Sequence, residues 1–79
     1  MAHNLATLDS AYLEAQRKVD ARLGYSNPYA MPIAMRAIRQ ASETLGADAS
    51  TGDIVDHAFH GRLRGAVRAV LRARKVPLN

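Results

Sequence analysis

The segment from Ser50 to Lys75 constrains the fold of this 79-residue chain most strongly, because its residue types repeat with the period of an α-helix. Apolar residues recur every three or four positions, which places them on one face of a helix. They are Val55, Phe59, Leu63, Ala66, Val67 and Val70. Pro77 excludes continuation of the helix past the end of this segment. The sequence therefore predicts one long helix over residues 51–75.

The first residues of the segment are typical of a helix start. Ser50 or Thr51 is a suitable N-cap, and the carboxylate of Asp53 favours the positive end of the helix dipole. Neither Glu nor Gln occupies the third helical position, so we expect the capping box to be incomplete.

Two further faces of the predicted helix carry distinct residue types. Basic side chains form a stripe opposite the apolar face, consisting of Arg64, Arg68, Arg72 and Lys75, with Arg62 and Arg74 beside it. Small residues four positions apart form a third line, consisting of Gly61, Gly65, Ala69 and Ala73. Because glycine costs about 1 kcal/mol relative to alanine inside a helix, this line indicates close helix packing, within the monomer or across a homodimer interface. Backbone approach to a ligand and a loosened helix are the alternatives.

Two shorter helices are predicted before this segment. Residues 5–23 carry apolar positions at helical spacing, and Gly24 is suited to end that helix. A second helix is expected over residues 32–45, opened by Pro32 and ended by Gly46. No stretch alternates with the period of a strand. The predicted fold is thus all-α, a small three-helix domain with a long basic C-terminal helix.

Length and residue usage favour a small protein that depends on association. Residues 1–79 are enough for a single domain. A core of this size supplies only about 3–5 kcal/mol, and the chain has no cysteine for disulfides. We therefore expect a homodimer or folding against a partner. No stretch approaches the roughly 20 apolar residues of a membrane span, and the first ten residues lack the regions of a signal peptide. We expect a cytoplasmic protein that does not bind membranes.

The net charge of +4 is unevenly distributed. Residues 1–50 contain five basic and five acidic residues, whereas residues 51–79 contain six basic and two acidic residues. A segregated basic helix indicates an anionic partner. Our main hypothesis is a small non-catalytic protein that binds nucleic acid, most specifically DNA, through phosphate contacts of this helix. Its role would be that of a regulatory protein or a phage accessory protein. The alternative is an adaptor or inhibitor that docks on an acidic partner protein. The main hypothesis requires a continuous helix and guanidinium groups that no acid from elsewhere neutralises.

A helix-turn-helix register can be placed on the chain with Gly46 in the turn. Two features oppose it. Gly52 occupies a position that usually holds a branched apolar residue, and Asp53 and Asp56 would face the phosphates that line the groove. We therefore expect any DNA contact to come from the C-terminal half of the long helix.

The remaining candidate groups are weaker. Asp53, His57 and His60 would share one helical face and form an incomplete metal site. The linker residues Tyr25, Tyr29 and Met31, with Met35, either cover the end of the core or form an adaptable interaction surface. The chain has no glycine-rich phosphate loop, nucleophile elbow or zinc-finger spacing. We expect no cofactor and no enzymatic activity.

Overall fold

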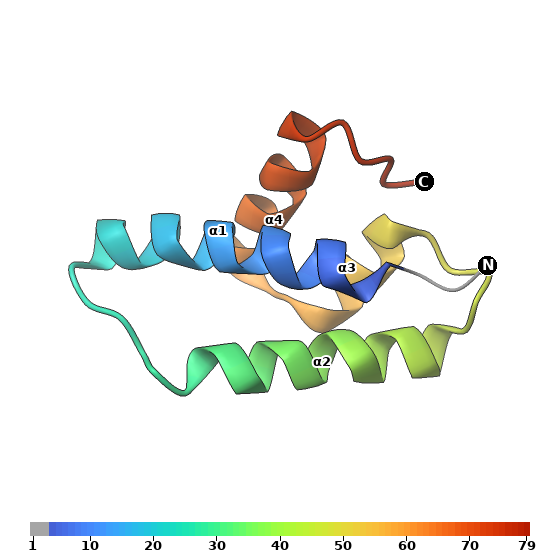
Figure 1. Ribbon diagram of the computed structural model, residues 1–79, viewed down its shortest axis with the longest axis horizontal. Coiled ribbons are helices and arrows are strands. Elements are labelled where there is room, and N and C mark those ends of the chain that lie inside the picture. Colours follow the sequence, from blue (N-terminus) through green and yellow to red (C-terminus); the bar gives the residue numbers. More distant parts are fainter. Residues whose placement is uncertain (1–3) are drawn as a thin grey trace.

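The computed structural model describes residues 4–79, and this part of the chain contains helices and no strands (Figure 1). The helices are α1 (Leu5–Leu23), α2 (Ala30–Leu45), α3 (Thr51–Ala58) and α4 (Gly61–Ala73). The all-α class predicted from the sequence is confirmed. α1 and α2 run in opposite directions along the longest dimension of the molecule, and α4 rises steeply from them (Figure 1). α1 packs mainly on α4, and α2 packs mainly on α3.

The ends of the first two helices follow from local chemistry. The Asn4 side chain accepts a hydrogen bond from the Thr7 amide at 3.2 Å and caps α1. Gly24 ends α1 in the left-handed conformation with φ 78°, and its amide donates to the carbonyl of Asp20 at 2.8 Å. Gly46 likewise follows α2 with φ 82°. Only glycine adopts these backbone angles without strain, so the predicted stops at both glycines are confirmed.

The continuous helix predicted over residues 51–75 is wrong. Phe59 and His60 adopt extended backbone angles, with φ −125° and −134°, and these two residues separate α3 from α4. Gly61 then opens α4 with φ 61°. The break lets α4 turn away from α3 and pack across α1. The apolar spacing does not predict the break, because Phe59 occupies a position that the pattern of a continuous helix also assigns to the buried face.

The capping box at the start of α3 is complete, contrary to our expectation. The Ser50 hydroxyl accepts from the Asp53 amide at 3.0 Å, and the Asp53 carboxylate accepts from the Ser50 amide at 3.3 Å. The shorter aspartate side chain therefore performs the role usually given to glutamate.

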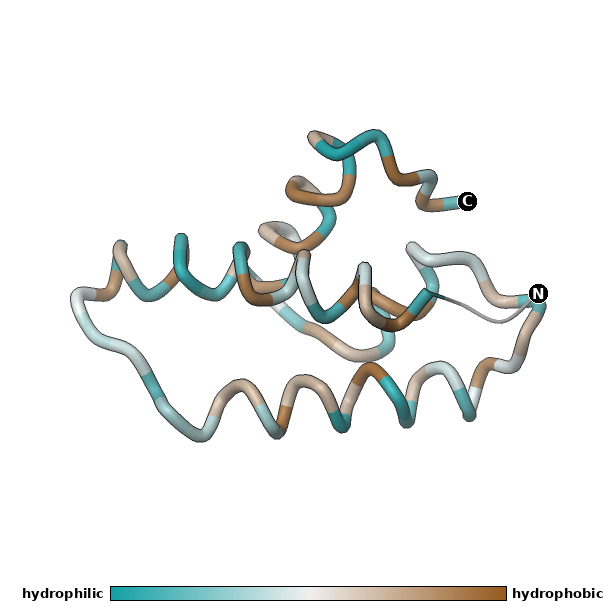
Figure 2. The backbone as a smooth tube through the Cα atoms, viewed as in Figure 1, coloured by the Kyte–Doolittle hydropathy of each residue, from teal (hydrophilic) through white to brown (hydrophobic). Residues whose placement is uncertain are grey.

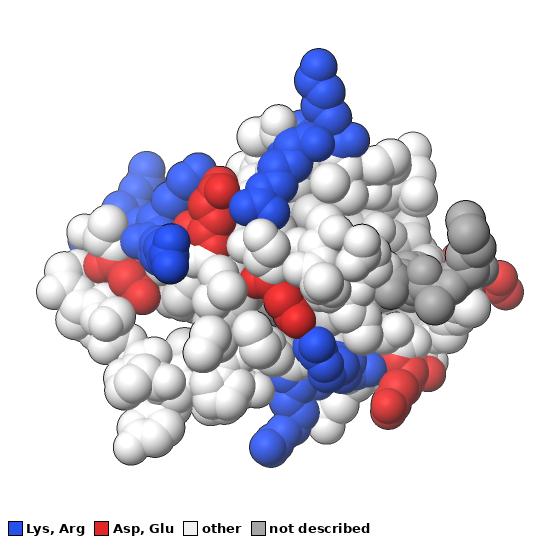
Figure 3. All heavy atoms as spheres, in the orientation of Figure 1, with Lys and Arg blue, Asp and Glu red and all other residues white. Residues whose placement is uncertain are grey.

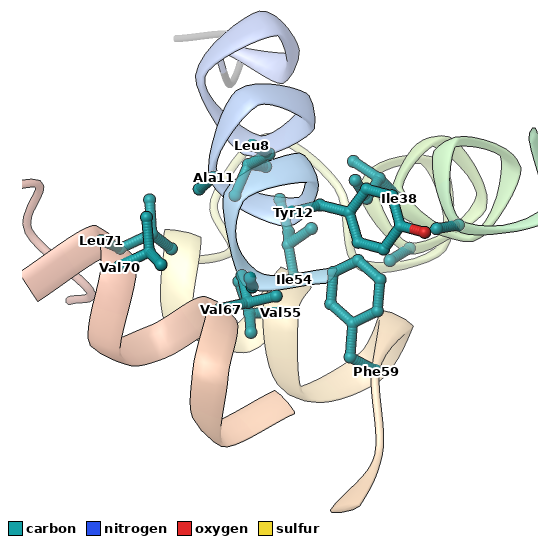
Figure 4. Packing of buried hydrophobic residues seen from close by; sticks show 13 residues of the cluster. Leu8, Ala11, Tyr12, Ile38, Ile54, Val55, Phe59, Val67, Val70 and Leu71 are labelled. Carbon is teal, nitrogen blue, oxygen red and sulfur yellow. The ribbon is translucent and has the colours of Figure 1, made fainter. Parts of the chain in front are cut away.

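One hydrophobic core joins all four helices. Polar and apolar residues alternate along each helix, as the hydropathy colouring shows (Figure 2). The largest fully buried side chains are Tyr12, Leu8, Ile38, Ile54, Leu71, Val55, Val67 and Val70 (Figure 4). Phe59 is 4% exposed, and its ring stacks on that of Tyr12 with centroids 5.5 Å apart. The residue that breaks the helix is thus also a core residue.

Tyr12 brings an unsatisfied polar group into this core. The residue is 1% exposed, and within residues 4–79 its hydroxyl has no hydrogen-bond partner. Burial, with a smaller contribution from the charge of Asp20, raises the pKa of Tyr12 above its ordinary value. The fold therefore favours the neutral phenol.

Tyr12→Phe is expected to raise the free energy of unfolding by about 1 kcal/mol, because it removes a buried donor without a partner. Since the native state holds the raised pKa, the tyrosine protein should lose stability as the pH rises above the ordinary tyrosine range, near 10. The phenylalanine variant should not show the part of this loss of stability that comes from ionisation of Tyr12. Urea denaturation of both proteins at neutral and alkaline pH measures the two effects. A variant less stable than the parent would show that the hydroxyl is satisfied in solution.

The C-terminal tail packs over the start of α3. The Gly52 amide, one of the free donors of the first helical turn, donates to the carbonyl of Leu78 at 2.8 Å. A Cβ added at Gly52 would lie 2.6 Å from that carbonyl oxygen. Glycine is therefore needed here because the tail approaches the helix so closely.

Gly52→Ala is expected to displace the tail and lower the free energy of unfolding by about 1–3 kcal/mol. Gly65→Ala is the matched control, because a Cβ there meets no atom within 4 Å. In a helix interior the same change should stabilise by about 0.5–1 kcal/mol. Thermal unfolding of both variants gives the comparison. Equal responses would mean that the tail does not dock as described.

Candidate nucleic-acid interface

α4 carries the basic residues that the sequence singled out. Its buried face is formed by Val67, Val70 and Leu71, which pack into the core. Residues 57–79 contain no Asp or Glu. Arg64, Arg68 and Arg72 all lie within α4, so the break before Gly61 leaves their four-residue spacing, about 6 Å along the helix, intact. Lys75 lies beyond the helix, in the left-handed conformation with φ 59°.

Two of the basic side chains are neutralised by acids from other helices. The Arg68 guanidinium donates to the carboxylate of Asp56 at 2.8 Å and approaches the carbonyl of Gly52 at 3.5 Å, which ties α4 to α3. The Arg74 guanidinium donates to Glu14 at 3.0 Å and to the Ser10 hydroxyl at 2.9 Å, which ties the end of α4 to α1.

The Arg74 contact also changes the acid that it binds. The hydrogen bond from Arg74 is the main cause that holds the pKa of Glu14 below its ordinary value, with Lys18 at 3.5 Å as a smaller contributor. Glu14 therefore stays ionised, and available to Arg74, at a lower pH than an isolated glutamate. The requirement that every guanidinium be free of acids is not met, and any polyanion contact has to come from the other basic residues.

Four basic residues of this segment are exposed, and within residues 4–79 none of their side chains has a hydrogen-bond or ion-pair partner. They are Arg62, Arg64, Arg72 and Lys75. They divide between two surfaces, because Arg62 lies on the flank of α4 that faces α1 and lines a groove there. Arg64 lies on the opposite flank, and Arg72 lies on the outer face, in line with Gly61 and Gly65. Lys and Arg gather over the end of α1 and over the upper part of α4 (Figure 3).

The groove on the α1 side joins Arg62 to Lys18 and Arg22 of α1. It has a volume of about 690 Å³ and is lined by Lys18, Val19, Ala21, Arg22, Leu23, Arg62 and Ala66. Lys18 and Arg22 are not among the binding residues that the sequence predicts. They lie forty or more positions before Arg62 in the chain, and only the return of α4 along α1 brings them together.

The line of small residues lies on the outer face of α4. Gly61, Gly65, Ala69 and Ala73 are all exposed. A Cβ added at Gly61 or Gly65 would meet nothing within 4 Å. Close helix packing within the monomer, which was one of our expectations, is therefore wrong. A homodimer contact through this line remains a prediction.

The weaker candidate groups are not assembled into a site. Asp53 is engaged in the capping box, and His60 lies in the extended break and not on a helical face with His57. No group of three His, Cys, Asp or Glu residues within the described part of the chain is placed to hold a metal. Tyr25 and Tyr29 are 65% and 72% exposed, so they do not cover the core. With Met31, at 45% exposure, they form an open apolar surface.

The structure also opposes a helix-turn-helix that binds DNA through α3. α2 and α3 do turn after Gly46, but Asp53 and Asp56 are exposed on α3. Gly52 is buried beneath the C-terminal tail. A short helix with exposed carboxylates is unsuited to enter a groove lined by phosphates.

No model of a known protein family matches this chain, and no match is found among curated proteins or solved structures. Over residues 4–79, none of the helices has both the length and the apolar character required to cross a bilayer.

Proposed function

We propose that this chain is a non-catalytic nucleic-acid-binding module whose α4 lies against the phosphate backbone of duplex DNA. The observation that carries the proposal is the set formed by Arg64, Arg72 and Lys75, exposed and unpaired within the described residues. They belong to a stretch, residues 57–79, without any acid. The guanidinium groups of Arg64 and Arg72 are eight residues apart on α4, about 12 Å along its axis. At this spacing they can reach separate phosphates of one backbone.

The outer face of α4 favours close approach of a backbone. Gly61, Gly65 and Ala69 are exposed between the basic side chains and project little beyond the helix surface. A polyanion can therefore come near the helix while the longer arginine side chains reach around it. This interpretation explains the glycine at position 65, inside the helix, despite its cost of about 1 kcal/mol. Gly61 is already accounted for by its φ of 61° at the start of α4.

The start of α4 also favours an anion. His60 makes no side-chain cap, and the first turn contains no acid. Arg62 and Arg64 lie instead within this turn, where the helix dipole disfavours positive charge. A bound phosphate would accept from the free backbone amides and offset this repulsion.

Titration of a nonspecific DNA duplex at several salt concentrations tests the proposal. Three phosphate contacts predict a slope of log affinity against log salt of about −3. Gel-shift or fluorescence anisotropy measurements give the slope directly. A slope near zero, or no binding at low salt, would overturn the proposal.

Matched single substitutions separate free from paired arginines. Arg64→Gln should make the salt slope shallower by about 0.9, the value for one lost phosphate contact. Arg74→Gln should leave the slope unchanged, because Glu14 already neutralises Arg74. Both changes remove one positive charge, so equal effects would indicate a response to net charge and not to the surface of α4.

A further inference from the structure

The chain contains an acidic region that the proposed function does not use. Residues 40–61 contain four acids and no Lys or Arg, while the rest of the chain has eleven bases and three acids. The four acids are Glu43, Asp48, Asp53 and Asp56. The last two are committed within the fold, to the capping box and to Arg68. Glu43 and Asp48 are exposed, and no partner is found for them within residues 4–79.

Glu43 and Asp48 lie at the end of α2 and in the loop that follows it. This is the right-hand end of the molecule in Figure 1, opposite the linker between α1 and α2. In the space-filling view, acidic residues are visible at this end as well as elsewhere on the face (Figure 3). Leu45 lies between the two acids in the sequence and is 38% exposed. This end, which we call the acidic end (residues 43–48), therefore combines two unpaired carboxylates with an apolar side chain.

The groove between α1 and α4 has the complementary composition. Its lining residues include three cations, Lys18, Arg22 and Arg62, which we call the rim, and no acid. Of these, Lys18 is already ion-paired with Glu14 at 3.5 Å, so Arg22 and Arg62 are the available charges. The aliphatic lining residues, which we call the floor, include Val19, Leu23 and Ala66, and Leu23 is 50% exposed. We call this site the basic groove. Aliphatic residues do not bind a phosphate backbone, whereas a segment that carries both carboxylates and an apolar side chain suits floor and rim together.

We propose that the basic groove receives the acidic end of a second copy of this chain. Leu45 of one copy would cover the floor near Leu23 of the next, with Glu43 and Asp48 beside the cationic rim. The two surfaces are different and lie toward opposite ends of a molecule 38 Å long. The contact is therefore head-to-tail, and each added copy leaves one groove and one acidic end open. Such an interface is small and mainly electrostatic, so it should be weak and sensitive to salt.

Sedimentation of the protein in the absence of nucleic acid tests this inference. At low ionic strength the average mass should rise steadily as the concentration approaches about 1 mM, the range of weak contacts. It should return to that of one chain in about 0.5 M salt, where screening shortens the reach of the charges. A mass that stays at one chain throughout overturns the inference.

Two neutralised variants make the test specific. The first carries Glu43→Gln and Asp48→Asn at the acidic end, and the second carries Arg22→Gln and Arg62→Gln in the basic groove. Each variant alone should remain monomeric. An equal mixture should form dimers and nothing larger, because only one pairing of an intact groove with an intact acidic end is available. All four residues are exposed, and circular dichroism verifies that both variants fold.

Other outcomes contradict the proposal. A dimer that persists in both variants would assign self-association to another face, such as the small residues of α4. A mixture that stays monomeric would show that the two surfaces do not meet. None of the four substitutions affects Arg64, Arg72 or Lys75. A result that overturns self-association therefore leaves the nucleic-acid proposal unaffected, and a protein that fails to bind DNA could still self-associate.

Discussion

Phe59→Ala is expected to lower the free energy of unfolding by about 3–5 kcal/mol. Phe59 is 4% exposed, and its ring lies parallel to that of Tyr12, with an interplanar angle of 4°. The expected loss is as large as the whole contribution of about 3–5 kcal/mol that a core of this size supplies. Far-UV circular dichroism should therefore show a largely unfolded variant at room temperature.

Two neighbouring substitutions control for this result. Phe59→Leu keeps most of the apolar volume and should cost about 1.5 kcal/mol or less. His60→Ala changes the other residue of the break, which is exposed, and should be within about 0.5 kcal/mol of the parent. If Phe59→Ala denatures in urea at the same concentration as His60→Ala, Phe59 does not anchor the break between α3 and α4.

Reversal of two charges on α4 is expected to give the largest loss of binding. The double variant Arg64→Glu, Arg72→Glu replaces two proposed phosphate contacts by two repulsive carboxylates. Affinity for nonspecific duplex at low salt should fall roughly 100-fold or more. Fluorescence anisotropy with a labelled duplex measures the change. The fold should be unaffected, because both side chains are exposed and unpaired within residues 4–79.

A second double variant keeps the net charge equal. Arg17 of α1 and Arg36 of α2 are exposed and belong neither to the outer face of α4 nor to the basic groove. Reversal of both to glutamate should lower the affinity much less, because only long-range attraction is reduced. If the two double variants bind equally weakly, DNA responds to overall charge and no defined interface exists on α4.

The helix limits could be predicted where local chemistry decides them. Gly24 and Gly46 end their helices through their own backbone freedom, and this is readable from residue type. The break at Phe59 could not be predicted in this way, because a buried aromatic residue fits the helical spacing equally well. The pair His60–Gly61 was the available signal, since a glycine within a predicted helix indicates either packing or an altered backbone. We interpreted it as packing.

The basic surface was only partly predictable for a different reason. The residue types and their spacing on α4 follow from the sequence, but which guanidinium groups are free does not. Asp56 lies twelve positions before Arg68, and Glu14 lies sixty positions before Arg74. The Asp56–Arg68 pair exists only because the chain breaks between α3 and α4. The Glu14–Arg74 pair and the meeting of Arg22 with Arg62 in the basic groove exist only because α4 packs against α1.

Amide chemical shifts, recorded while a short nonspecific DNA duplex is added, test whether α4 presents a nucleic-acid interface on its outer face. We expect shift changes to concentrate at Gly61, Arg64, Gly65 and Arg72, with the acidic end around Glu43 and Asp48 unaffected. Changes confined to the open apolar surface at Tyr25 and Tyr29, or no changes at low salt, would contradict it.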